Sequence, residues 1–331
     1  MLIYVLRRVL WMVPAMFGIT VLLFVVMRLA PGDPATIRFG DMGQASAGGA
    51  NYEAAITKFR QRYHLDEPWH VQYGYWIKSV ATLDFGYEFE RPAVPVRQEL
   101  WRRLSITVPL SVVSVLLAYL IALPLGVFSA VRQRTLADRV STLLLFLLYS
   151  LPTFWAGLML ILVFGKTGLG WLPVLGLHDK DAATLSTWAW WKDLGLHCIL
   201  PIATMTYGSL AYLSRIMRVG MLETVRQDYI RTARAKGLSE RVVVLRHALR
   251  NSLVPVVTVF ATILPVLIGG SVLVEQIFNI PGMGLYAYEG LMKRDYNVVM
   301  ATTTISAVMT LLGFLLSDIL YAVVDPRISY E

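Results

Sequence analysis

The stretch Asp228-Tyr-Ile-Arg-Thr-Ala-Arg-Ala-Lys-Gly-Leu-Ser-Glu240 lies between two strongly apolar parts of the chain. The wider segment around it, residues 215–251, is called the basic segment here, because it carries nine Lys or Arg residues and only three acidic ones. Such a sequence is too polar to enter a bilayer and too regularly patterned to be a slack linker. We therefore expect two short helices joined by a bend.

The bend is predicted at Gly237, which follows a basic helix end and can adopt a left-handed backbone at no steric cost. Ser239 and Glu240 then resemble an N-cap and a first-turn acid that open the next helix. Ala233 and Gly237, four residues apart, are expected to leave a bare strip that another protein can approach closely. An ordinary positively charged cytoplasmic loop is the simpler alternative.

The composition predicts a polytopic membrane protein, since 56% of the 331 residues are hydrophobic, only 16% are charged, and the mean hydropathy is +0.58. The net charge of +8 does not indicate nucleic acid, because the basic residues flank apolar spans, as membrane topology and anionic lipids require. The single cysteine, Cys198, excludes an internal disulfide and a cysteine-based metal cluster.

Six apolar segments are long enough to span a bilayer. The first follows Arg7-Arg8 and so imitates a secretion signal, but it lacks a small-residue cleavage site and is interpreted as an uncleaved span. No organellar transit signal is visible, so the predicted location is a bacterial inner membrane. The six segments are Val9–Leu29, Ile106–Ala130, Ser141–Phe164, Ile199–Met217, Leu253–Val274 and Val299–Val323.

The orientation follows from the basic residues of the short loops. Without the ten in the long loop Arg28–Arg103, fifteen Lys or Arg lie on one side and five on the other. Both termini and the basic segment are therefore expected in the cytoplasm, with the long loop outside. Within that loop Pro68 predicts a helix start, followed by a stripe of Trp69, Tyr73, Trp76 and Val80. The stripe either lies at the membrane interface or packs on the bundle, or it docks an external partner. The stretch Asp41–Asn51 is expected to be a flexible insert.

Several kinds of chemistry are expected to be absent. Gly165-Lys166-Thr167 imitates a phosphate-binding loop but lacks the glycine required at position 160, which is Leu160. No nucleophile–base motif is visible, so the chain is not expected to be an enzyme, to bind ATP or to hold a cofactor. No metal site is expected either, because the histidines show no metal-ligand spacing; they are His64, His70, His178, His197 and His247.

Polar residues inside the predicted spans have two interpretations. Asp318, beside Ser317, is either a structural contact between helices, which we favour, or a proton carrier. Uncharged polar residues either bond across helices or line a path for a polar solute. The candidates for such a path are Ser114, Tyr207, Thr258, Thr262 and Thr303.

The segments Tyr229–Arg241 and Leu245–Pro255 resemble the cytoplasmic coupling loop of ABC-importer permeases, and specifically the dipeptide/oligopeptide/nickel permease family. The resemblance covers nearly the whole chain. Other matching stretches are Leu6-Arg-Arg-Val9, Ala30-Pro-Gly-Asp-Pro34, Leu65-Asp-Glu-Pro-Trp69, Asp84-Phe-Gly86, Val274-Glu-Gln-Ile-Phe-Asn-Ile-Pro-Gly-Met-Gly284, Arg294-Asp-Tyr296 and Asp325-Pro-Arg327.

This resemblance implies an all-α membrane fold, with a first helix and outer loop over 1–100 and a permease domain over 101–325 that contains the coupling loop 219–251. It implies a second, similar permease, two cytoplasmic ATPases and an outer solute-binding protein as partners, and peptides or related small solutes as cargo. The chain departs from the general loop pattern Glu-Ala-Ala, three residues, Gly, because Arg231 stands where that pattern has an acid. The coupling residues implied are Tyr229, Arg231, Thr232, Ala233, Arg234, Ala235, Lys236, Gly237 and Leu238.

Two other classes of function remain as alternatives. An ion- or proton-coupled secondary transporter predicts paired charges at mid-membrane or repeated halves, and neither is evident in the sequence. A membrane anchor or receptor without transport predicts no polar pathway and no ATPase partner.

Overall fold

The computed structural model describes residues 2–45, 50–260 and 263–324, and almost all regular structure in these ranges is helical. The β structure found there is an isolated bridge between Tyr87 and Pro95. The chain divides into two compact units. The first consists of Met1–Ile106 and Gly282–Leu311, and the second of Thr107–Pro281 and Leu312–Glu331.

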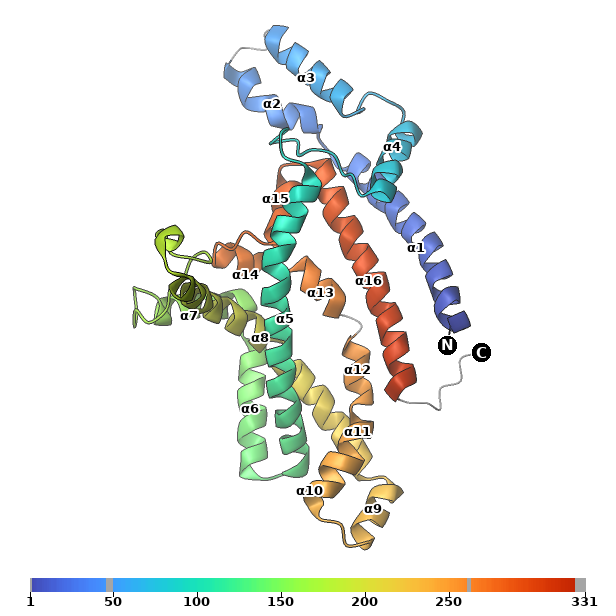
Figure 1. Ribbon diagram of the computed structural model, residues 1–331, viewed down its shortest axis with the longest axis vertical. Coiled ribbons are helices and arrows are strands. Elements are labelled where there is room, and N and C mark those ends of the chain that lie inside the picture. The colour runs from blue at the N-terminus through green and yellow to red at the C-terminus, as the bar shows by residue number, and fades with distance from the viewer. Residues whose placement is uncertain (1, 46–49, 261–262, 325–331) are drawn as a thin grey trace. The chain divides into compact units, whose positions relative to one another are not determined.

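The first unit begins with one long apolar helix and continues with three shorter ones (Figure 1). Pro68 precedes α4, which confirms the predicted helix start. Two residues of the predicted stripe pack on α1: the Trp76 and Phe24 rings stack at 6.2 Å, and the hydroxyls of Tyr73 and Thr20 lie 3.0 Å apart. Trp69 is 51% exposed, and Val80 packs against a different apolar cluster that includes Phe85. The helices are α1 (Leu2–Leu29), α2 (Pro34–Ala45), α3 (Ala50–Arg62), α4 (Trp69–Thr82), the start of α5 (Val96–Val131), α15 (Met283–Met292) and the start of α16 (Tyr296–Val324).

The predicted insert Asp41–Asn51 falls partly outside the described residues. α2 continues to Ala45 and α3 begins at Ala50, so both ends of the stretch are helical.

The second unit contains the long helix α8, which shorter helices precede and follow in the sequence. The N-terminus of α8 is capped by Ser186, whose hydroxyl accepts a hydrogen bond from Ala189 N at 3.4 Å. The elements are the rest of α5 and α16, α6 (Leu136–Ser150), α7 (Thr153–Phe164), the 3₁₀ turn η1 (Ala182–Thr184), α8 (Thr187–Val225), α9 (Asp228–Ala235), α10 (Glu240–Val242), the π-helical η2 (Val243–Ala248), α11 (Leu249–Ser252), α12 (Val254–Phe260), α13 (Ile263–Gly269) and α14 (Val272–Ile277).

Within the described ranges, α1, α5, α8 and α16 are long and apolar enough to span a membrane. The segment predicted as one span over Ser141–Phe164 is instead the pair α6 and α7, bent by 99°. The bend has a local cause, because Pro152 excludes Leu151 from the helical region, and Leu151 is extended with ψ 128°. With this pair counted as one span, the described helices give up to five spans.

The fifth predicted span, Leu253–Val274, is represented by the short helices α12, α13 and α14. Residues 261–262, between α12 and α13, lie outside the described ranges. Six spans therefore remain a prediction.

Candidate functional site

The basic segment folds into a packed group of short helices at the end of α8 (Figure 1). Ile230 on α9 is fully buried, and it belongs to one apolar cluster with Val243 of η2 and with Met217 and Met221 of α8. The two short helices and the bend predicted from sequence are thus confirmed. Together with η2 they form a helical hairpin, residues 228–248, whose inner face is a small hydrophobic core. Burial of a side chain as large as isoleucine stabilises such a hairpin by about 1.5–3 kcal/mol.

The bend also has the predicted backbone. Gly237 has φ +78°, in the left-handed region, and follows the end of α9. The guanidinium of Arg234 closes the bend by donating to the carboxylate of Glu240 at 2.6 Å. Ser239 occupies the predicted N-cap position, but its side chain makes no capping hydrogen bond. Its carbonyl accepts from Val242 N at 2.9 Å, so the backbone alone begins the helix.

One detail of the predicted docking strip is wrong. Ala233 is only 7% exposed and lies in the apolar cluster, because it faces the core formed by η2 and α8. A Cβ added at Gly237 meets no atom within 4 Å, so the glycine itself faces open space. The exposed residues of the predicted coupling set are Tyr229, Arg231, Thr232, Arg234, Ala235, Lys236, Gly237 and Leu238, which makes this face predominantly basic.

Close contacts fix this hairpin to the helices that enter and leave it. Asn251 of α11 donates to the hydroxyl of Tyr229 on α9 at 2.7 Å. α8 and α11 cross so closely that a Cβ on Gly220 would lie 2.7 Å from the carbonyl oxygen of Ser252. Arg218 of α8 donates to the buried carboxylate of Asp138 on α6 at 3.0 Å. These contacts join the hairpin to α8 and α11, and Arg218 joins α8 to α6.

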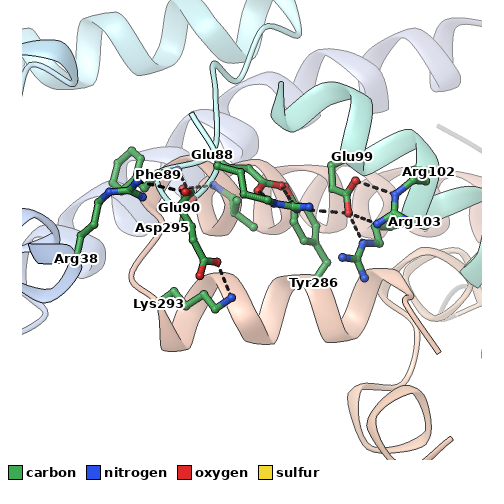
Figure 2. Close-up of polar contacts among 12 residues, drawn as sticks. Arg38, Glu88, Phe89, Glu90, Glu99, Arg102, Arg103, Tyr286, Lys293 and Asp295 are labelled. Carbon is green, nitrogen blue, oxygen red and sulfur yellow. Dashed lines mark hydrogen bonds and ion pairs between the residues drawn. The ribbon is translucent and has the colours of Figure 1, made fainter. Parts of the chain in front are cut away.

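A second polar site lies in the first unit, where α15 and the start of α16 meet residues 88–103 (Figure 2). The carboxylate of Asp295 accepts from Phe89 N at 2.5 Å, and Tyr286 donates to Glu88 at 2.8 Å. Arg91 also pairs with Glu88, at 2.6 Å. Together these side chains border a cavity of about 350 Å³.

Burial governs the electrostatics of this second site. Asp295 is 3% exposed, and its burial raises the pKa of the carboxyl to about 6. Burial, reinforced by the carboxylate of Glu88, also raises the pKa of Tyr286. This site was not predicted from the sequence, because Asp295 and Phe89 are 206 residues apart and only the folded chain brings them together.

The proposed path residues do not form a group that the structure identifies. Ser114 and Tyr207 make bonds to backbone, with Ser114 Oγ donating to Leu110 O at 2.8 Å and the Tyr207 hydroxyl donating to Leu151 O at 2.8 Å. Thr258 is exposed and Thr303 belongs to the first unit, whereas Thr262 lies outside the described residues. The path remains a prediction.

A cluster of possible metal ligands occurs near the start of α8, where none was expected. The cluster brings three ligand atoms within 4.8 Å of one another, one from each of Asp179, Asp193 and His197. Sequence spacing did not indicate this cluster, because a loop separates Asp179 from the other two residues. His178 Nδ1 lies 2.9 Å from the Asp193 carboxylate and ties this loop to α8.

Comparisons with known proteins identify the family of the chain. Residues 122–330 match the family described as "Binding-protein-dependent transport system inner membrane component". The chain is 43% identical to the oligopeptide transport system permease protein AppB of Bacillus subtilis, over 99% of both chains. It is 36% identical to the dipeptide transport system permease protein DppB of Alkalihalophilus pseudofirmus, over 100% of both.

The fold is also similar to that of a solved transporter. The chain of an inward-facing MetNI methionine ABC transporter matches with a TM-score of 0.52 at 20% identity, covering 69% of this chain and 97% of that one. This likeness concerns the fold alone. The family match and the near-complete relatives decide the classification: the chain belongs to the binding-protein-dependent transport system inner membrane components, the multi-pass permeases of bacterial ABC importers.

Proposed function

We propose that this chain is a permease subunit that moves short peptides across the bacterial inner membrane, powered by ATP hydrolysis on separate subunits. The observation that carries the proposal is its 43% identity, over 99% of both chains, to a permease named for oligopeptide transport. A second relative of full length is named for dipeptides, so the shared chemistry of the cargo is an amide bond together with a terminal amine and carboxylate.

The proposal includes a topology and a set of partners. Six spans, cytoplasmic termini and an outer loop before residue 101 place the basic segment on the ATPase side of the permease domain 101–325. Two ATPases, a second permease of similar sequence and an outer solute-binding protein complete the assembly. The packed hairpin around Gly237 supports this arrangement, because a rigid basic projection joined to α8 can pass a displacement to the bundle. The nine coupling residues predicted from sequence would act through this projection and carry out no chemistry.

The test is uptake of a radiolabelled tripeptide by proteoliposomes that contain the complete complex and its binding protein. We expect the tripeptide to accumulate in the lumen when ATP is enclosed there, on the side of the ATPase subunits. We expect no accumulation when a non-hydrolysable ATP analogue is enclosed instead. Accumulation driven by an imposed proton gradient without ATP would instead support a secondary transporter. Binding of peptide without any transport under either condition would support a receptor, and both outcomes contradict the proposal.

A further inference from the structure

The first unit contains a second cavity, of about 320 Å³, which the coupling and translocation roles do not use. It lies among the end of α1, the loop after α3, the helix α4 and the start of α16. Its walls include the aromatic rings of Tyr63, Trp76, Phe89 and Tyr296. The volume falls at the lower end of the range for small-molecule sites, which are mostly apolar with a few oriented polar groups.

Two polar residues of α4 line this cavity one helical turn apart, Gln72 and Trp76. Gln72 is only 5% exposed, and its Nε2 donates to Leu65 O at 3.1 Å and to Glu67 O at 2.5 Å. These two bonds fix the orientation of the amide. Its Oε1 and the indole Nε1 of Trp76 are both buried and have no hydrogen-bond partner among the described residues.

An unpaired buried donor or acceptor costs about 1–3 kcal/mol, so a pair of them needs an explanation. Here one atom is an acceptor and the other a donor, and side chains at positions i and i+4 lie on the same helix face. The backbone of a peptide, which offers N–H donors and C=O acceptors along its length, carries the complement of this pair.

The cavity also holds a positive charge. Arg28 lines it, and the Arg28 guanidinium lies 5.2 Å from the centre of the Phe24 ring and 4.9 Å from that of Tyr296. Arg28 forms no ion pair in the described part of the chain, whereas Arg60, in the same unit, pairs with Asp33 at 2.7 Å. Phe24 also stacks on Trp76, so Arg28 and Trp76 contact the same ring. A guanidinium binds a carboxylate through two parallel hydrogen bonds.

We propose that this cavity binds the C-terminal end of a short peptide. Arg28 holds the terminal carboxylate, Gln72 Oε1 accepts from the last peptide N–H, and Trp76 Nε1 donates to a peptide carbonyl. The aromatic walls contact the C-terminal side chain. The choice of a peptide as ligand rests on the proposed function, and the inference goes further by assigning a peptide site to the permease chain itself.

The test is equilibrium dialysis of the purified full-length chain in lipid nanodiscs, without binding protein or ATPase, against radiolabelled Gly-Leu-Phe. We expect saturable binding that weakens at least tenfold for the C-terminal amide Gly-Leu-Phe-NH₂. This comparison needs no mutation, so it holds even where a variant fails to fold.

Matched variants then locate the site. Arg28→Gln and Trp76→Phe should each weaken binding about five- to tenfold or more, since each removes a bond to the ligand. The exposed residues Arg97 and Trp69 serve as controls, and Arg97→Gln and Trp69→Phe should leave the affinity unchanged. Each variant is checked for an unaltered melting temperature.

Three results overturn the inference: no binding by the isolated chain, equal binding of the acid and the amide, or binding that survives both site variants. None of them affects ATP-driven uptake by the complete complex, which tests the proposed function separately. If instead the complex transports no peptide, the proposed function fails whatever the dialysis shows.

Discussion

Arg234 and Glu240 form a 2.6 Å ion pair across the bend at Gly237, so charge joins α9 to α10, beside the apolar cluster that α9 forms with η2 and α8. The hydrogen bond from Arg234 lowers the pKa of Glu240 below its usual value of 4.5. Because both side chains are partly exposed, solvent screens the pair and limits its contribution to at most about 1 kcal/mol.

The ion pair should make the basic segment sensitive to acid. A carboxylate whose folded pKa is lowered contributes stability above its unfolded pKa, and loses it as pH falls through the folded value. Arg234→Gln should therefore lower the melting temperature of the purified permease slightly at pH 7, and the difference should vanish at low pH or high salt. Arg231→Gln is the control, because the Arg231–Asp228 pair is far more exposed. Equal effects of the two variants would contradict this assignment.

Gly237→Ala should impair transport through backbone strain. No atom lies within 4 Å of the added Cβ, so the change creates no clash, but an alanine at φ +78° costs about 1–2 kcal/mol. Gly237→Val should be worse, since β-branched residues tolerate this region least. We expect reduced peptide uptake together with weaker co-purification of the ATPase subunits.

Gly195→Ala supplies the control for the glycine experiment. Gly195 lies in the interior of α8 with open space around it, so alanine there should be neutral or stabilise the helix by up to about 1 kcal/mol. Unchanged uptake in Gly237→Val would mean that the bend is an ordinary loop.

Asp295 should make the first unit more stable in mild acid. Its folded pKa is about 6 because burial disfavours the charged form, whereas the unfolded value is near 3.8. The folded state therefore binds more protons between these values, and the free energy of unfolding rises as pH falls from about 6 to about 4, by on the order of 2–3 kcal/mol. Melting of the wild type relative to Asp295→Asn should show this dependence, and the exposed Asp84→Asn should not alter it.

Local signals were enough to predict the basic hairpin and the start of α4. Gly237 in its basic context and Pro68 before an aromatic stripe act within a few residues, so the sequence alone indicates their backbone. The burial of Ala233 was not predictable in this way, because it depends on η2 and α8 folding back over α9. The polar network around Asp295 was missed for the same reason, since its members come from distant segments.

The predicted spans show a related limit. Hydropathy over 141–164 indicated one helix, and only the backbone restriction imposed by Pro152 on Leu151 produces the 99° bend. The helix α4 repeats the lesson on a smaller scale. Gln72 is polar and lies outside the aromatic stripe, a pattern typical of a solvent-facing residue, yet it is buried, because its amide donates to the carbonyls that precede the helix.

Labelling of α4 tests the orientation of the chain. Lys78 is exposed, whereas the buried Gln72 is unsuitable for this purpose. With Cys198 replaced by serine, Lys78→Cys should react with an impermeant thiol reagent in intact spheroplasts. A cysteine at the exposed Arg231 should react only after lysis. The reverse pattern would invert the proposed topology.

Asp318 distinguishes a mechanism driven by ATP from one driven by protons. The residue lies on α16 beside the buried Ser317, about two turns before the end of that helix. If it serves as a hydrogen-bonding group between helices, Asp318→Asn keeps nearly the same shape and bonding capacity, so ATP-driven uptake should fall by no more than about twofold. If it carries protons, neutralisation should abolish accumulation and remove its dependence on pH.

The measurement is uptake by the reconstituted complex with asparagine at 318, with ATP and with a proton gradient alone. We expect uptake to persist with ATP and to be absent with the gradient, because hydrolysis on the ATPases supplies the work. Gradient-driven accumulation by the unmutated complex, lost in the variant, would overturn the ABC-importer mechanism.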